Sequence, residues 1–149
     1  MKQIAEHGSC FVCGSENPNS IGVKWYSLDD GTIRGEITLD RGQQGPPGYA
    51  HGGASAAILD EAMGIAVWHK GSMAAAVNIS VDYLHPVPLD EKIIIKGKVT
   101  ERVGKTIEAV GEISLPGGTI VVTATGRYVE AKHLFGKWAE GFQENQLEG

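Results

Sequence analysis

The sequence contains no long uninterrupted hydrophobic run: no stretch reaches the about 18 apolar residues that a membrane-spanning helix needs. The first residues, MKQIAEHGSC, also lack the apolar core of a signal peptide. We therefore expect a cytoplasmic protein with no membrane partner.

Positive charge is sparse as well, because the chain has 13 Lys and Arg but 18 Asp and Glu, which gives a formal net charge of -5. The basic residues are scattered, whereas a nucleic-acid-binding face needs them clustered, so we expect no nucleic-acid partner.

Cysteine is scarce too: the chain has only Cys10 and Cys13, within CFVCG. Structural zinc usually takes four protein ligands, and no second CxxC follows; His7 could supply a third ligand, but the sequence identifies no fourth. A redox CxxC is expected beside a helix in a βαβ unit, whereas this one precedes the turn-rich GSENPNSIG. A structural or incidental role is favoured, and the metal-binding and redox alternatives stay open. We expect no metal and no cofactor.

What the sequence does contain fits a single globular domain. Of its 149 residues, 42% are hydrophobic and 21% are charged, which is typical of a chain that buries a core. We divide it into a turn-rich N-terminal segment packed on the domain (1–22), the domain itself (23–131) and a C-terminal tail (132–149). The tail has a pattern that would suit either a short helix or a frayed end.

The first part of the domain predicts a β-hairpin. Residues 23–39 alternate between apolar and polar positions on both sides of the turn residues Asp29–Gly31, as paired strands do. The following residues, 40–50, are too rich in Gly and Pro for a helix or a strand and predict a loop.

The middle of the chain predicts one buried helix, bounded by Gly52-Gly53 and Lys70-Gly71 and apolar on most of its circumference. From residue 73 to residue 131 the period changes to two, and turn residues separate four strand candidates. A helix of this composition, about 25 Å long, cannot lie exposed. The predicted fold is therefore an α+β hotdog fold, in which a curved antiparallel sheet of about six strands wraps around one long central helix.

Several motifs resemble one family. His51-Gly52-Gly53, followed by Asp60 nine positions after the histidine, resembles the signature of hotdog-fold acyl-CoA thioesterases of the PaaI-like group, in the 4-hydroxybenzoyl-CoA thioesterase superfamily. The similarity extends from residue 10 to residue 128 and includes the segments CFVCGSENPNSIGVKWY, RGQQGPPGYAHGG and VDYLHPVPLDEKIII. The resemblance implies hydrolysis of an acyl-CoA to free acid and CoA by a homodimer, often assembled further into a tetramer.

The resemblance also implies roles for individual residues. The backbone N–H of Gly52 polarises the thioester carbonyl, Asp60 acts as nucleophile or general base, and His51 orients the site. Gln44 contacts the carbonyl or the attacking water. The candidates for substrate binding are Gln44, Gly53, Glu61 and Asn78. Family members often have Ser or Thr on the strand after the helix, where this sequence has Ala74–Ala76.

The chemistry and the spacing together predict a dimer. A helix N-terminus offers unpaired N–H groups to a developing oxyanion, and Gly52 and Gly53 let a carbonyl approach without meeting a Cβ. Asp60 is eight residues further on, about 12 Å along the helix axis, too far to act on the same carbonyl. Two antiparallel helices related by a two-fold axis would bring Gly52 of one chain to Asp60 of the other.

The adjacent carboxylates cannot share one site equally, because neighbouring helical positions differ by about 100° of rotation. The spacing in related sequences favours Asp60 as the catalytic acid. Glu61 then needs a partner, and Arg34, Arg102 and Lys105 are open candidates.

Two other functions are alternatives to the thioesterase. One is a hydratase or dehydratase of the same fold, using His51 and Asp60. The other is a module that binds acyl-CoA without catalysing a reaction.

Overall fold

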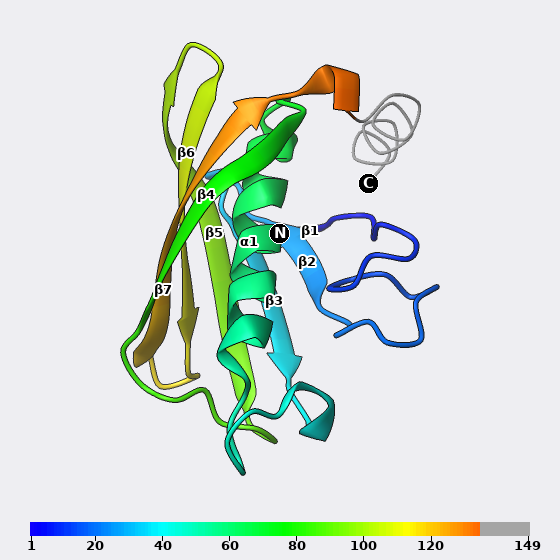
Figure 1. Ribbon diagram of the computed structural model, residues 1–149, viewed down its shortest axis with the longest axis vertical. Helices are drawn as coiled ribbons and strands as arrows, with labels where there is room; N and C mark the ends of the chain where they lie inside the picture. Colours follow the sequence, from blue (N-terminus) through cyan, green and yellow to red (C-terminus); the bar gives the residue numbers. More distant parts are fainter. Residues whose placement is uncertain (135–149) are drawn as a thin grey trace.

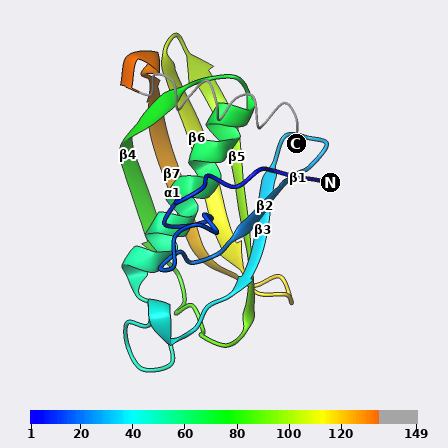
Figure 2. The ribbon, with the colours of Figure 1, turned by 90° about the vertical axis from the view of Figure 1, so that its right-hand side faces the viewer.

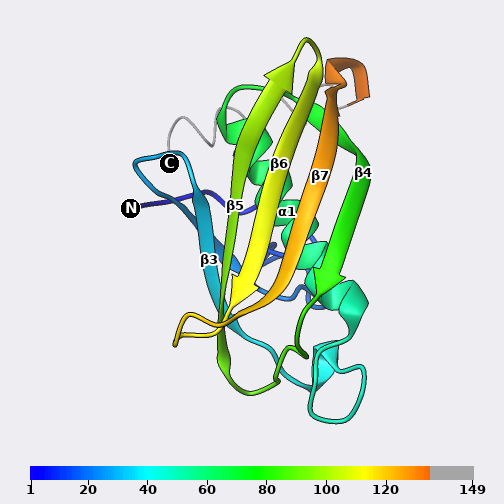
Figure 3. The same ribbon diagram turned by 90° about the vertical axis from the view of Figure 1, so that its left-hand side faces the viewer.

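A computed structural model describes residues 1–134, which form one long α-helix, one short 3-10 helix and seven strands. The helices are α1 (Gly52–His69) and η1 (Arg41–Gln43). Neighbouring strands are all antiparallel, in the spatial order β1-β2-β3-β5-β6-β7-β4 (Figures 1 and 3). The strands are β1 (Lys2–Gln3), β2 (Lys24–Ser27), β3 (Ile33–Thr38), β4 (Ala74–Tyr83), β5 (Lys92–Val103), β6 (Thr106–Ser114) and β7 (Ile120–Glu130).

The predicted α+β hotdog architecture is confirmed, since the curved sheet wraps around α1 (Figure 1). The described residues contain one strand more than the predicted six. This strand, β1, pairs Lys2 with Ser27, and two residues are too few to show an alternating pattern in the sequence. From residue 135 on, the C-terminal tail lies outside the described residues.

Glycines allow the sheet and the helix to approach closely. The hairpin between β2 and β3 turns at Gly31, whose φ of +87° is easily reached only by glycine. On β5, a Cβ added to Gly97 would lie 2.7 Å from the carbonyl carbon of Ala62 in α1. The backbones of β5 and α1 are therefore in near-direct contact, and Leu59 and Met63 are fully buried beside them.

The N-terminal segment covers the side of α1 that the sheet leaves open (Figure 2). Ile4, Val12 and Cys13 of this segment are buried in the common core. The segment thus forms part of the wall around the helix. No helix within residues 1–134 combines the length and the apolar character needed to cross a membrane.

The two edges of the sheet differ. The edge at β1 consists of two residues. At the other edge, β4 has ten residues, and among the strands of residues 1–134 it pairs with β7 alone. Val77 and Ile79 on β4 are 58% and 36% exposed. A long, exposed and apolar edge strand is a template for pairing with another chain.

Candidate active site

The start of α1 presents a backbone donor. His51 caps the helix, and its Nδ1 accepts a hydrogen bond of 2.8 Å from Gly53 N. The Tyr83 hydroxyl donates to the Gly52 carbonyl at 2.6 Å. Among the described residues, no acceptor for the Gly52 N–H is found. This N–H is thus available to a ligand, at the positive end of the helix dipole.

Asp60, half-buried in the middle of α1, is held by a residue from the sheet. The Tyr128 hydroxyl on β7 lies 3.0 Å from both the carbonyl oxygen and Oδ1 of Asp60. Burial, together with the nearby charge of Asp60, raises the pKa of Tyr128 well above its usual range. Tyr128 therefore remains a neutral hydrogen-bond donor that fixes the position of the Asp60 carboxylate.

Sequence reasoning missed Tyr128, although its strand was predicted. The alternating pattern of residues 119–131 indicates that one face of β7 is buried, but it does not say what that face contacts. Tyr128 is 68 residues from Asp60 in the chain. Only the position of β7 beside β4 and α1 brings the two together. In this chain, the hydroxyl beside Asp60 is therefore that of Tyr128 on β7. The strand after the helix, where the family resemblance predicts Ser or Thr, has Ala74–Ala76 instead.

Two hollows meet at Asp60. One is a cavity of about 390 Å³, roughly the size of known small-molecule sites. Its lining includes Asp60, Glu61, Trp68, Ala76 and Tyr128, together with the N-terminal residues His7, Cys10, Phe11 and Val12. The other is a groove between α1 and β4, where Asp60 and Asn78 lie together.

The predicted site residues form two groups within one chain. His51, Gly53 and Gln44 line a hollow of about 320 Å³ at the start of α1, and Gln44 Oε1 accepts from Gly48 N at 3.1 Å. Asp60 and Asn78 form the second group. Asp60 is eight positions after Gly52 in the helix, about 12 Å along its axis. A single chain therefore holds the two halves of the predicted site apart.

The prediction that Arg34, Arg102 or Lys105 is the partner of Glu61 is wrong. The carboxylate of Glu61 faces β2 and the N-terminal segment: Oε2 accepts from Trp25 Nε1 of β2 at 2.6 Å, and Oε1 lies 2.7 Å from Cys10 Sγ.

None of the three basic candidates contacts Glu61 in the described part of the chain. Arg34 lies on the face of β3 opposite to the buried Ile33 and pairs with Glu36 at 2.6 Å. Arg102 pairs with Glu130.

The side chain of Glu61 is largely buried, with 12% of it exposed. Burial raises the pKa of Glu61. For His7, burial alone would lower the pKa, but a hydrogen bond with Cys10 and the nearby charge of Glu61 outweigh it and raise the pKa to about 9.

The curved sheet that wraps around one long helix, with a free amide at the helix start and a carboxylate between two hollows, defines a protein of the hotdog class. The family model described as Thioesterase superfamily matches residues 47–124, just over half of the 149 residues. The chain belongs to the thioesterase superfamily.

Curated relatives include the acyl-coenzyme A thioesterase THEM4 of Xenopus laevis, 40% identical over 65 residues. That match covers 43% of this chain and 29% of the relative, so the matched segment spans less than a third of that relative's length. THEM4 of Mus musculus is 30% identical over 98 residues, covering 62% of this chain and 37% of the relative.

Solved structures agree on the fold. A thioesterase superfamily protein of known crystal structure is 35% identical, with a TM-score of 0.80, over 83% of this chain and 61% of that one. A hypothetical thioesterase of Streptococcus pneumoniae TIGR4, solved with coenzyme A, has a TM-score of 0.69 at 23% identity, over 73% of this chain and 85% of that one.

Proposed function

We propose that this protein hydrolyses an acyl-CoA thioester to a free acid and CoA. The observation that carries the proposal is the Asp60 carboxylate, held by Tyr128 beside a cavity of about 390 Å³. Family membership adds support, as do the THEM4 relatives, which are named acyl-coenzyme A thioesterases. One protein of the same fold was solved with coenzyme A.

The proposed chemistry divides the work between a backbone amide and a carboxylate. The Gly52 N–H polarises the thioester carbonyl, and one such donor contributes about 3 kcal/mol to the transition state. Asp60 either removes a proton from an attacking water or attacks the carbonyl itself. With water as nucleophile, a C–O bond forms, the tetrahedral intermediate collapses, the C–S bond breaks and the CoA thiolate leaves.

We propose that two chains build each site. The exposed edge of β4 would pair with the β4 edge of a second copy, in an isologous contact. Beside that edge, α1 presents small residues, including Ala56 and Ala57, in the groove next to Val77. Two antiparallel copies of α1 would then place Gly52 of one chain near Asp60 of the other. Further assembly into a tetramer stays a prediction, as does the cytoplasmic location.

The remaining site residues fit this arrangement. His51 and Gly53, at the helix start, would shape the carbonyl pocket, and Gln44 borders the same hollow. Asn78 would approach the substrate from the β4 side, next to Asp60. Glu61 lines the cavity through its position on α1, but its carboxylate is bound to Trp25 and faces the N-terminal segment.

The test is thiol release from a panel of acyl-CoAs by the purified protein. We expect turnover of at least one member, with free CoA and free acid formed in equal amounts. Addition of water to an enoyl-CoA, without thiol release, would instead identify a hydratase. Binding of acyl-CoAs with no reaction on any panel member would identify a binding module.

A further inference from the structure

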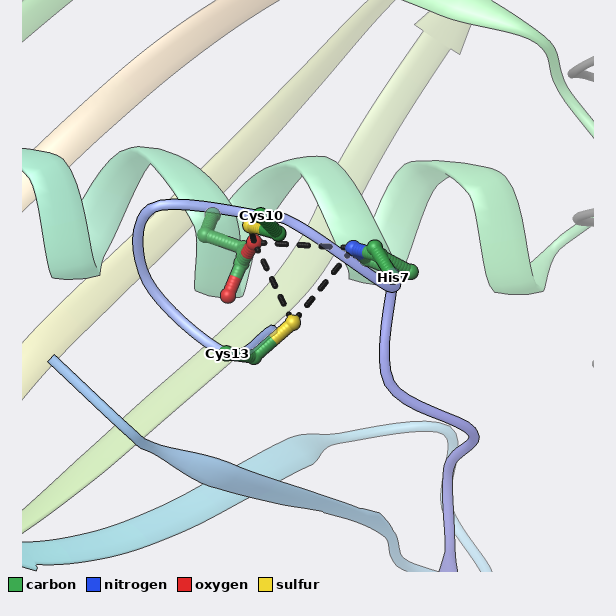
Figure 4. Close-up of side chains that lie close together, drawn as sticks. His7, Cys10 and Cys13 are labelled. Atoms are coloured by element: carbon green, nitrogen blue, oxygen red, sulfur yellow. Dashed lines mark hydrogen bonds and ion pairs between the residues drawn. The ribbon is translucent and has the colours of Figure 1, made fainter. Parts of the chain in front are cut away.

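The N-terminal segment and α1 bring four metal-ligating side chains to one point. His7, Cys10 and Cys13 come from the loop that covers the helix (Figure 4). Glu61 comes from α1. One ligand atom from each residue lies within 4.8 Å of those of the other three. We propose that these four residues form a structural site for a divalent metal ion, zinc by the chemistry of its ligands.

Three of the distances between the ligand atoms match those expected around a bound cation. Oε1 of Glu61 is 3.6 Å from His7 Nδ1 and 3.7 Å from Cys13 Sγ, and Cys13 Sγ is 3.6 Å from His7 Nδ1. An N···O separation of this length is not a hydrogen bond. Ligands of a tetrahedral zinc ion, with bonds of about 2.0–2.3 Å, lie roughly 3.3–3.8 Å apart. The 2.7 Å contact between Cys10 Sγ and Glu61 Oε1 would have to widen.

The local backbone builds the ligand loop by two successive turns. Cys10 N donates to His7 O at 3.0 Å, and Gly14 N donates to Cys10 O at 2.9 Å, so the HxxCxxC spacing places three ligands on one side of the loop. Gly14 is required for close packing, because a Cβ there would lie 2.3 Å from Cys10 N.

A second layer of contacts orients the ligands. Trp25 Nε1 donates to Oε2 of Glu61 at 2.6 Å and leaves Oε1 to face the cluster. Val12 N lies 3.4 Å from Cys10 Sγ and donates to it. Outer-layer donors of this kind fix metal ligands in place and tune the ion. The cluster is also sheltered, since the side chains of His7 and Glu61 are 10% and 12% exposed.

The ligand types select zinc and a structural role. Two thiolates, an imidazole and a carboxylate form a mixed soft and borderline set that suits Zn²⁺ better than Mg²⁺ or Ca²⁺, which prefer oxygen. Four protein ligands leave no open coordination position for a substrate or water. The ion would join the N-terminal loop to the middle of α1. Because Cys10, Phe11 and Val12 line the same cavity as Asp60, the ion would fix one wall of that cavity.

The fourth ligand explains why the sequence alone left this site open. The pair Cys10 and Cys13 and the neighbouring His7 are visible as a motif, but Glu61 is 48 residues beyond Cys13. The proposal therefore replaces the expectation of no metal. It does not depend on thioesterase activity, since the ligands and the predicted catalytic acid are different residues.

The test uses the full chain, reduced and stripped of metal with a chelator, and then titrated with Zn²⁺ or Co²⁺. We expect one ion per chain. Bound Co²⁺ should give the intense visible bands of a tetrahedral site and a near-ultraviolet thiolate-to-metal band. Zn²⁺ should also raise the melting temperature. No uptake of either ion by the reduced wild-type chain would overturn the proposal, as would Co²⁺ binding without a thiolate band.

Variants assign the ligands. Cys13→Ser and Glu61→Gln should each weaken Zn²⁺ binding by at least about a hundredfold, the upper end of the loss known for outer-layer partners of metal ligands. Glu112→Gln makes the same chemical change on β6, outside the cluster, and should leave the affinity unchanged. Equal affinity in Glu61→Gln and Glu112→Gln would contradict the role of Glu61. The wild-type Co²⁺ spectrum decides the proposal even if Cys13→Ser fails to fold.

Discussion

Asp60 and Glu61 are neighbours in the sequence, but the two sides of α1 on which they lie differ in construction. The Asp60 side faces β7 and the exposed edge of β4, and it holds a carboxylate beside open hollows. The Glu61 side is covered by the N-terminal segment, and its carboxylate is enclosed by His7, Cys10, Cys13 and Trp25. One step along a helix, about 100° of rotation, thus separates an acid accessible to a substrate from an acid fixed in a closed cluster.

The two sides of α1 should differ most in the loss of kcat when the negative charge of Asp60 or of Glu61 is removed. Asp60→Asn should lower kcat by about a hundredfold to ten-thousandfold, the usual contribution of a general base, while acyl-CoA still binds. Steady-state kinetics and binding measurements on the same preparation check this. The matched change on the other side, Glu61→Gln, should cost far less in kcat, because that carboxylate does not face the substrate. A severe loss in Glu61→Gln with a fully active Asp60→Asn would reverse the assignment.

The next effect concerns the helix start. Gly52→Pro removes the one N–H that is proposed to bind the oxyanion, and should lower kcat about a hundredfold to a thousandfold. Proline is well tolerated at the first helical position, and His51, with φ of -62° and ψ of 138°, already has the conformation preferred before proline.

Gly52→Ala is its control. Alanine adds a Cβ at the same place, 3.1 Å from the Tyr83 hydroxyl oxygen, but keeps the N–H. Equal kcat values for the Pro and Ala variants would show that this N–H has no part in the reaction.

A smaller but still large effect is expected at the β4 edge. Val77→Asp places a charge on the proposed contact between copies and should produce monomers with at least about tenfold lower activity, since a buried unpaired charge disfavours association. Light scattering and thiol release check the two results together. Val103→Asp, on a valine that is 68% exposed at the end of β5, should keep both the dimer and the activity. A fully active Val77→Asp monomer would contradict the shared site.

The smallest effect should come from the hydroxyl that positions Asp60. Tyr128→Phe removes one hydrogen bond and should lower the free energy of unfolding by about 1 kcal/mol. We expect kcat to fall by no more than about tenfold, which corresponds to roughly 1.4 kcal/mol in the transition state. KM should change little, because the residue acts through Asp60. Denaturant unfolding and kinetics separate the two contributions, and an unchanged kcat would exclude a positioning role.

The sequence predicted the elements well because their patterns are local. Gly52 and His69 bound the helix within a residue or two of the predicted limits, and residues 73–131 form the four strands predicted there. The contacts across the fold were not predictable in the same way. Tyr128 reaches Asp60, and His7 reaches Glu61, only after the sheet has wrapped around α1. Periodicity shows which face of a strand is buried but not which residue it will meet.

The central claim is that each active site combines Gly52 of one chain with Asp60 of another, and mixing two inactive variants tests it most directly. Asp60→Asn and Gly52→Pro chains, mixed and allowed to exchange subunits, should form dimers with one intact site. With random pairing, activity should return to roughly a quarter of the wild-type value. If both residues act within one chain, every site in the mixture carries one defect, and activity would stay at the level of the separate variants.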